Sequence, residues 1–442
     1  MHRTKTTRMK YALRFKKLPK ADWDHSLPVE LLEVIFDEAL GEFTEGGTPM
    51  TDRRRIVQPL LRRLSRVCQT WYYVLTPMLY HEIYLSSSNA LAALARAVTK
   101  YPDLQPLVHS FQFGSTMYRS ARIDISQSDV WHIKRIYNAC PNIDSLTVQR
   151  SLNIGGIRLG EDRIYTTCAD GFDSGRLARL THLEVELPHG MPCNDYLVYS
   201  SDLILPALQE LVLDVQKGVK SPPNRAQHSM SWPQMPQLTR LCIKNWYIAH
   251  GCFTFPEHSD KLRVVELLGG NYWNVSSFFD QDLRKISKTL ESLTITAIEV
   301  GSYHSFHVDL RCLTALTELC IPLVTYQRWD LVWYPPTLRR FILTGNPEKD
   351  FKEEDILLLE EVEAKLGDLL QLRLRSCTLP NLKLVRLMVK SIWMWELSPL
   401  VKFKAALEAA KKGNVQVAFG FLPGDENTMK GKVMKKLYKD FL

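Results

Sequence analysis

The sequence predicts an α/β protein in which a small all-α module precedes an irregular repeat solenoid, a horseshoe with parallel strands on its concave face. Two observations support this prediction. Two amphipathic helical patterns lie close together near the start of the chain, within residues 26–85. From about residue 90 onward, an apolar spacing typical of short strands recurs many times, and helical patterns precede several of these strands.

The first helical pattern is the stretch SLPVELLEVIFDEAL, residues 26–40. Its apolar residues occupy much of the helix circumference, so either the rest of the fold or another protein must cover them. A loop is expected at residues 41–55, and a second helix over residues 58–77. The stretch MLYHEIYL, residues 78–85, alternates like a short strand. One face of the second helix is expected to carry Leu60, Leu64, Val67, Trp71 and Leu75.

The repeats follow the pattern apolar-x-x-apolar-x-apolar. Between Leu183 and Leu372 the central apolar residues are 22 to 31 positions apart, near the period of leucine-rich repeats. The pattern around Val385 follows too closely for a full repeat, so we expect an edge or cap element there, and a last strand at residues 414–422. The central residues are Phe111, Leu146, Leu183, Leu211, Leu241, Val265, Leu293, Leu319, Phe341, Leu372 and Val385.

The N-terminal pattern resembles an F-box, because it contains the LP-x-E opening, the V-C-x-x-W motif in the later helix and the L-Y pair that follows. With irregular leucine-rich repeats behind it, the chain resembles the F-box proteins expanded in mushroom-forming (basidiomycete) fungi. The loop of about 18 residues between the two helices is longer than usual in that family. The residues that match the F-box core or its adaptor-binding face are Leu27, Pro28, Leu31, Ile35, Leu64, Val67, Cys68 and Trp71.

The resemblance implies a function. In the family, the F-box binds a Skp-type adaptor and through it a cullin, and the repeats bind a protein substrate of an SCF-type E3 ubiquitin ligase. By that comparison Trp71 is expected in the core of the module, and Leu27 and Pro28 at the contact with the adaptor. The implied segments are a basic, disordered tail (1–25), the F-box module (26–85), the leucine-rich-repeat domain (86–425) and a basic C-terminal tail (426–442).

Charge and cysteine usage restrict the compartment and the partners. The net charge of +8 lies in the first 20 residues, which hold eight basic residues and no acid, so the rest balances at 48 against 48. This tail is interpreted as a solvated segment, a nuclear-import signal or an anionic-surface contact, with a mitochondrial transit peptide less favoured. Nine scattered cysteines without a C-x-x-C pair indicate a reducing compartment, the cytoplasm and/or the nucleus.

Catalytic and membrane motifs are missing from the sequence. It contains no P-loop, nucleophile elbow or H-E-x-x-H motif, so a non-catalytic receptor without cofactor is expected. Two close pairs, His250 with Cys252 and His304 with His307, supply only two ligands each, whereas zinc needs three or four. No apolar run approaches the roughly 20 residues of a membrane span, and no signal-peptide pattern opens the chain.

The expected substrate surface is the face of the repeat strands that points away from the core. Early strands place Glu184, Glu186, Glu210 and Asp214 there, so one end is expected to be acidic and the other basic. The basic end is interpreted either as ordinary solvated surface or as a site for an acidic or phosphorylated segment. Loop aromatics are interpreted either as interface anchors or as packing. The proposed substrate-binding residues are Arg340, Arg373, Arg375, Arg386, Trp246, Trp273 and Trp329.

Three functions compete at this level. The leading hypothesis is a substrate receptor of an SCF-type ubiquitin ligase, and the second is a non-catalytic leucine-rich-repeat interaction scaffold without a role in ubiquitylation. The third is a nucleic-acid or chromatin binder that uses the basic tails, and the balanced charge outside the first 20 residues argues against it. Co-purification with an adaptor and a cullin discriminates between them.

Overall fold

The structure is a computed structural model of the whole chain. The described residues are 31, 34–35, 50–85, 87–114, 127–149, 178–187, 204–215, 234–248, 255–256, 260–272, 283–296, 310–322, 334–344, 363–371, 379–389 and 404–421. The chain divides into two compact units, Met1–Leu79 and Tyr80–Leu442. Each unit is described by itself below.

In the first unit, two helices replace the single helix predicted over residues 58–77. They are α2 (Met50–Leu64) and α3 (Gln69–His81), and the last two residues of α3 belong to the second unit. The backbone N–H of Val67 donates to Leu64 O at 3.0 Å, which tightens the end of α2. Cys68 then caps α3, since its Sγ accepts from the N–H of Trp71 at 3.5 Å.

The break between the helices divides the predicted apolar stripe. Leu75 is fully buried and forms a small core with Leu61 and Val74, against which Leu64 and Trp71 pack. Val67 and Cys68 instead lie exposed in the turn between the helices. The prediction that all these positions share one helical face is therefore wrong.

The helix boundaries also differ from those predicted. Because α2 begins at Met50, the second part of the loop expected at residues 41–55 is helical, and residues 41–49 lie outside the described residues. Pro77 does not end α3, which continues to His81. Of the strand predicted at residues 78–85, only the second half is a strand, β1 (Glu82–Leu85). The carbonyl that loses its usual donor to Pro77 belongs to Tyr73, which is exposed, so water can satisfy it.

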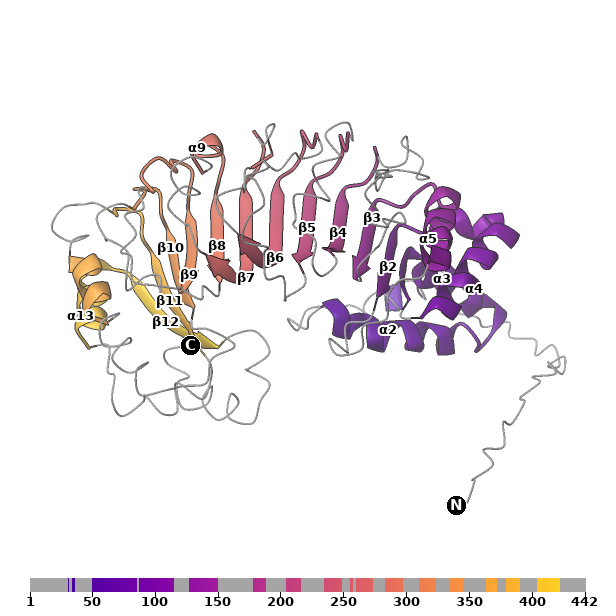
Figure 1. Cartoon of the computed structure of the whole chain (residues 1–442). Coiled ribbons are helices and arrows are strands. Elements are labelled where there is room, and N and C mark those ends of the chain that lie inside the picture. Colours follow the sequence, from indigo (N-terminus) through magenta and orange to yellow (C-terminus); the bar gives the residue numbers. More distant parts are fainter. Residues whose placement is uncertain are drawn as a thin grey trace, which may run out of the picture. The chain divides into compact units, whose positions relative to one another are not determined.

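In the second unit, the described residues form one parallel sheet of twelve strands, whose spatial order follows the sequence from β1 to β12 (Figure 1). A parallel sheet without crossovers in strand order is consistent with a solenoid-like repeat. The predicted α/β class and parallel strands are confirmed. The strands after β1 are β2 (Ser110–Gly114), β3 (Ser145–Gln149), β4 (His182–Leu187), β5 (Glu210–Val215), β6 (Arg240–Ile248), β7 (Val264–Tyr272), β8 (Ser292–Thr296), β9 (Glu318–Pro322), β10 (Arg340–Thr344), β11 (Leu384–Val389) and β12 (Gln416–Phe421).

Helices precede several strands, as the sequence predicted. The first two repeats carry α4 (Ser88–Lys100) and α5 (Gln127–Ala139), and a 3-10 helix, η1 (Pro102–Leu107), follows α4. Later repeats carry the short α9 (Leu283–Lys285) and α13 (Lys404–Gly413). Among the described residues, no helix combines the length and the apolar composition needed to cross a bilayer.

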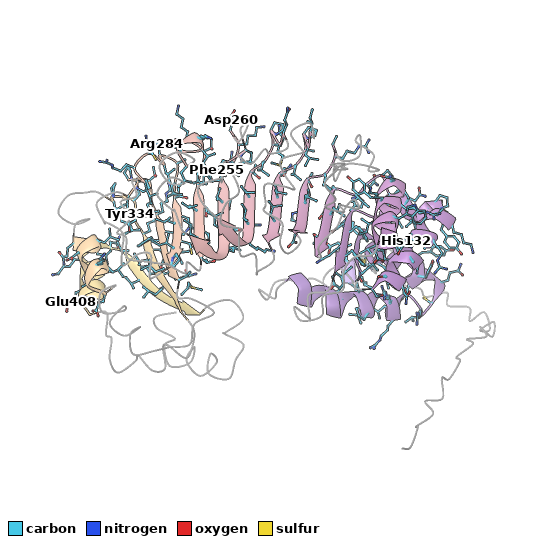
Figure 2. All side chains as sticks on the ribbon, in the orientation of Figure 1. His132, Phe255, Asp260, Arg284, Tyr334 and Glu408 are labelled. Atoms are coloured by element: carbon cyan, nitrogen blue, oxygen red, sulfur yellow. The ribbon has the colours of Figure 1, made fainter. Side chains whose placement is uncertain are left out.

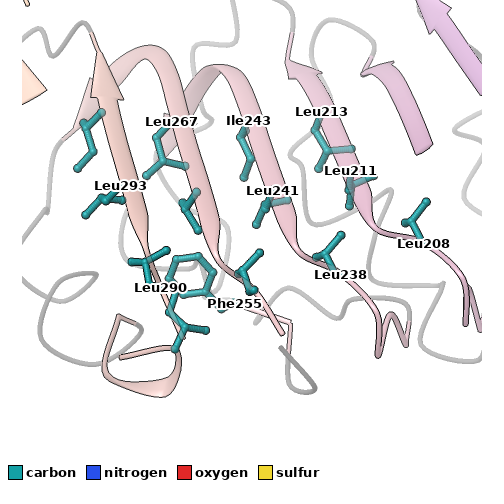
Figure 3. Close-up of a cluster of buried hydrophobic side chains, with 14 of the residues drawn as sticks. Leu208, Leu211, Leu213, Leu238, Leu241, Ile243, Phe255, Leu267, Leu290 and Leu293 are labelled. Carbon is teal, nitrogen blue, oxygen red and sulfur yellow. The ribbon is translucent and has the colours of Figure 1, made fainter. Parts of the chain in front are cut away.

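Strand alternation builds one continuous core in this unit. Leu211, Leu241 and Leu293 occupy the same register position on β5, β6 and β8, and all three are buried on the inner side of the sheet (Figure 3). Leucines in the turns before the strands, such as Leu208 and Leu238, extend the same cluster. Since no repeat alone can bury these side chains, stacking of neighbours supplies the core.

Backbone hydrogen bonds join each turn to the next. The carbonyl of Gln209, which precedes β5, accepts from the N–H groups of Thr239 at 2.8 Å and Arg240 at 3.0 Å. The carbonyl of Thr239 accepts in the same way from Arg263 and Val264. This ladder uses main-chain groups, so it tolerates irregular side chains at the turns.

The C-terminal repeats differ from those predicted. β10 pairs with β9 on one side and directly with β11 on the other, with Phe341 opposite Val385. The strand predicted around Leu372 therefore does not lie between them, and residues 372–378 lie outside the described residues. The strand around Val385, expected as an edge or cap, is internal, because β12 pairs with its other side. The last strand predicted at residues 414–422 is confirmed as β12.

We predict that Tyr334→Phe leaves the free energy of unfolding unchanged or raises it by about 1 kcal/mol. Burial raises the pKa of Tyr334, labelled in Figure 2, above its usual range. Its hydroxyl has no hydrogen-bond partner among the described residues. Its ring packs edge-on against Phe341 at 5.5 Å between centroids. Urea unfolding should therefore show Tyr334→Ala less stable by about 3–5 kcal/mol. A clear loss in Tyr334→Phe would contradict this assignment.

Candidate functional site

The candidate site is the outer face of the sheet, formed by the side chains that alternate with those of the core. Because the strands pair in register, residues at the same outward position lie opposite one another on neighbouring strands. The sequence places charged residues at several of these positions. One outward row, from β3 to β10, is Ser145, His182, Glu210, Arg240, Val264, Ser292, Glu318 and Arg340.

Arg240 on β6 is the centre of this face. Its Nη1 donates to Glu210 Oε1 at 2.6 Å, and its Nη2 donates to Glu266 Oε2 at 2.7 Å. His182 Nδ1 lies 3.0 Å from the other oxygen of Glu210. Four side chains on four successive strands, β4 to β7, are thus joined in one network.

A second ion pair crosses β5. Lys244 on β6 donates through Nζ to Glu184 Oε1 on β4 at 2.7 Å. Val212 lies on β5, the strand between them, directly opposite Glu184. It is only 5% exposed although it points outward. We attribute its burial to the aliphatic stem of Lys244, which must cross β5 to reach Glu184.

The pKa values follow from these contacts. The hydrogen bond from His182, followed by the charges of His182 and Arg240, lowers the pKa of Glu210 against the opposing effect of burial. Burial alone would lower the pKa of Arg240, but Glu266 and Glu210 raise it. Both side chains are therefore held in their charged forms near neutral pH.

Two cysteines on the same face are chemically inert at neutral pH. Burial, reinforced by the Glu266 carboxylate, raises the pKa of Cys242 to about 12. Burial and the Glu318 carboxylate raise the pKa of Cys320 to about 12 as well. Since the thiolate is the nucleophile, both thiols act as small apolar groups in this sheet.

The predicted basic end differs from the structure in its composition. Arg340 is exposed, but its Nε lies 2.7 Å from Glu318 Oε2, so an acid lies beside this arginine. Arg386 lies on β11, the strand next to Arg340, one outward position further along. The two guanidinium groups are therefore diagonal neighbours on one face. Arg373 and Arg375 lie outside the described residues.

Two of the four residues predicted for the acidic end form ion pairs with basic residues. Glu184 and Glu210 each face a cation on β6, as described above. Glu186 and Asp214 lie on β4 and β5, at opposed register positions. Glu184 and Glu210 are therefore neutralised by ion pairs, whereas Glu186 and Asp214 are two acids at neighbouring positions, as an acidic end requires.

Three aromatic residues were proposed as substrate contacts. Trp246 lies in β6, opposite Gly270 of β7. Trp273 and Trp329 lie outside the described residues. Trp246 is separated from Arg340 on β10 by three strands, so the structure does not bring these two residues together.

In the first unit, apolar side chains are exposed on helical backbone. Leu31, Val34 and Ile35 are spaced as one helical face, and each is about half exposed, as is Val67 after α2. Trp71 is partly buried against the small core, whereas it was expected to be a core residue. Leu27 and Pro28 lie outside the described residues.

Sequence reasoning missed Arg240, Lys244, Glu266 and Glu318. Each of them occupies an outward position next to a buried apolar residue of its strand. The signal was present in the sequence, because the repeats align by their central apolar residues and the outward charges then fall opposite one another. These charged residues form ion pairs because the parallel strand order places successive repeats side by side.

Metal binding finds no support in this part of the chain. Among the described residues, no three His, Cys, Asp or Glu side chains form a group that could hold a metal ion. His250, Cys252, His304 and His307 lie outside the described residues.

Comparison with known proteins adds no family to these observations. No protein-family model matches the chain, and no curated protein sequence matches it.

We predict that Glu210→Gln lowers the free energy of unfolding at pH 7 by about 1–3 kcal/mol, because Arg240 and His182 lose a charged partner. A carboxylate with a lowered pKa stabilises the fold above its ordinary pKa of 4.5, and this stabilisation is lost as pH falls through the folded-state pKa. The difference from the natural chain should therefore shrink at pH 3.

Chemical unfolding at both pH values measures this effect. Glu291→Gln is the matched control, since Glu291 is exposed and its nearest oxygen is 3.6 Å from Arg263. It should change the free energy of unfolding by less than about 0.5 kcal/mol. Equal losses for the two variants, or a difference independent of pH, would contradict a special role of the Glu210 network.

Proposed function

We propose that the chain is the substrate-recognition subunit of an SCF-type E3 ubiquitin ligase. Its N-terminal helices would form an F-box that binds a Skp-type adaptor, and through it a cullin, while a leucine-rich-repeat solenoid binds the protein substrate. One observation carries this proposal: Leu31, Val34, Ile35 and Val67 are exposed apolar side chains in a small helical unit. An apolar surface of this kind is typical of a docking site.

The second unit supports a receptor role. Its long parallel sheet presents an outer face of fixed, alternating charges, and its two outward cysteines are protonated at neutral pH. Such a face suits recognition rather than covalent chemistry, so we propose that the other subunits of the ligase perform the catalysis. We place this assembly in the cytoplasm and/or the nucleus.

We predict that the double variant Ile35→Asp/Val67→Asp lowers capture of a purified Skp-type adaptor by tenfold or more, because two charges would be placed in an apolar contact. Both residues are about half exposed, so the fold should tolerate the changes. Adaptor affinity is measured by titration calorimetry with the full chain.

Ile204→Asp is the matched control, because Ile204 is equally exposed but lies in the second unit. It should leave adaptor affinity unchanged. If the natural chain does not bind the adaptor, or if both sets of variants bind it equally well, the F-box assignment is wrong. Adaptor binding without cullin recruitment or ubiquitylation of any captured protein would instead favour the interaction scaffold.

Within this function, we propose that an acidic or phosphorylated segment of the substrate contacts the outer face at β10 and β11. Arg340 contacts Glu318 through its Nε, which leaves its two terminal nitrogens for another anion. Arg386 lies diagonally beside Arg340 on β11. Two guanidinium groups at this spacing can share one phosphate or carboxylate.

The variant Arg340→Glu/Arg386→Glu should therefore lower the capture of phosphorylated peptides from a random phosphopeptide library by about tenfold. Arg339→Glu/Lys383→Glu is the matched control: both residues are exposed, and they immediately precede the same two strands. Adaptor binding should be unaffected in both variants. Equal capture by both would show that these arginines are ordinary surface residues.

A further inference from the structure

The helices of the first two repeats form a surface that the proposed function does not use. α4 and α5 pack against each other, and the Nε of Arg135 on α5 donates to Thr99 Oγ1 on α4 at 3.0 Å. On α4, Arg96 and Lys100 lie on either side of Thr99 and are exposed. On α5, Trp131 lies one turn before Arg135 on the same side of the helix (next to His132, labelled in Figure 2). These groups form one contiguous surface.

The charge of this surface is one-sided. The two helices carry four cations, Arg96, Lys100, Lys134 and Arg135, and a single carboxylate, Asp129. That carboxylate is only 3% exposed and accepts a hydrogen bond from Ser88 Oγ at 3.0 Å. Arg96 and Lys100 are therefore exposed cations on a pair of helices whose single carboxylate is buried.

Two large aromatic rings accompany the cations. Trp131 is 54% exposed and Tyr101, directly after α4, is 52% exposed. The guanidinium of Arg135 lies 5.0 Å from the Trp131 ring, and Lys100 Nζ lies 5.2 Å from the Tyr101 ring. These contacts hold the rings and cations in place without covering them. Trp, Tyr and Arg are the residues most enriched at the energetic centres of protein interfaces.

We infer that Arg96, Lys100, Tyr101, Trp131 and Arg135, here named the cationic aromatic patch, bind an acidic segment of a partner protein. The cations would pair with its carboxylates, and Trp131 would pack against an apolar side chain within the same segment. The patch lies on helices, whereas the proposed substrate site lies on the outer face of the sheet. It is therefore a second docking surface, and it does not depend on the proposed function.

The size of the patch favours a short peptide over a nucleic acid. From Arg96 to Lys100 the cations span little more than one helical turn, about 6 Å, and two adjacent helices broaden this to roughly 15 Å. An extended peptide covers that length with about four or five residues. A groove that follows a nucleic-acid backbone needs a longer row of cations. Here the row ends at η1, where Asp103 is exposed two residues after Tyr101.

The test uses the full chain and three labelled probes in fluorescence anisotropy: an acidic peptide with a central leucine, a polyglutamate peptide of equal charge, and single-stranded oligothymidine. We expect the leucine-containing peptide to bind most tightly. Arg96→Glu/Lys100→Glu should weaken its binding by tenfold or more. Trp131→Ala should weaken the leucine-containing peptide severalfold but leave polyglutamate nearly unchanged.

Arg284→Glu/Lys288→Glu is the matched control, because it makes the same change of charge at two exposed residues at and after α9. The basic residues of the first 20 positions are present in every variant, so their contribution cancels. Thermal unfolding of each variant verifies that the fold is retained, as expected for exposed side chains.

Three results would overturn the inference. The first is an equal loss of peptide binding in the Arg284→Glu/Lys288→Glu control, which would indicate attraction by net charge alone. The second is tighter binding of oligothymidine than of the peptide, which would identify a nucleic-acid site. The third is no measurable binding of the leucine-containing peptide. None of these results bears on adaptor binding by the N-terminal unit, so the two proposals fail independently.

Discussion

The in-register parallel pairing of neighbouring repeats is the constraint on which the rest of the second unit depends. Each turn carbonyl, such as that of Gln209, accepts two N–H groups from the next repeat and so sets the alignment of the following strand. That alignment stacks Leu211 on Leu241 inside the sheet. The same alignment places Glu210 opposite Arg240 outside it, so core and surface are consequences of one register.

The outer face follows from this register by electrostatics. Carboxylates at neighbouring positions on strands about 4.8 Å apart repel one another, and a basic side chain placed between them removes this repulsion. Arg240 between Glu210 and Glu266 satisfies both acids. Toward β11 two residues of the same sign lie close together, because Arg386 is the diagonal neighbour of Arg340.

Much of the fold was predictable, and the failures have identifiable causes. Nine of the central residues, from Phe111 to Phe341, fall in β2 to β10 at one common register. The strand predicted around Leu372 does not lie between β10 and β11, and the described residues just before it, 363–371, are helical, with Leu366 and Leu370 buried. The turn at Val67 was missed because the apolar spacing of a helix continues through it. The ion pairs could not be predicted from single strands, since each pair joins side chains on two different strands.

The two units differ in how completely they bury their apolar residues. In the second unit, one cluster runs from Ile83 to Val415. In the described part of the first unit, the buried core is Leu61, Val74 and Leu75, and apolar side chains such as Ile35 remain in contact with solvent. A partner that covers those side chains binds the folded state alone and so stabilises it by mass action. The stability of this unit is then linked to the concentration of any partner that covers these side chains.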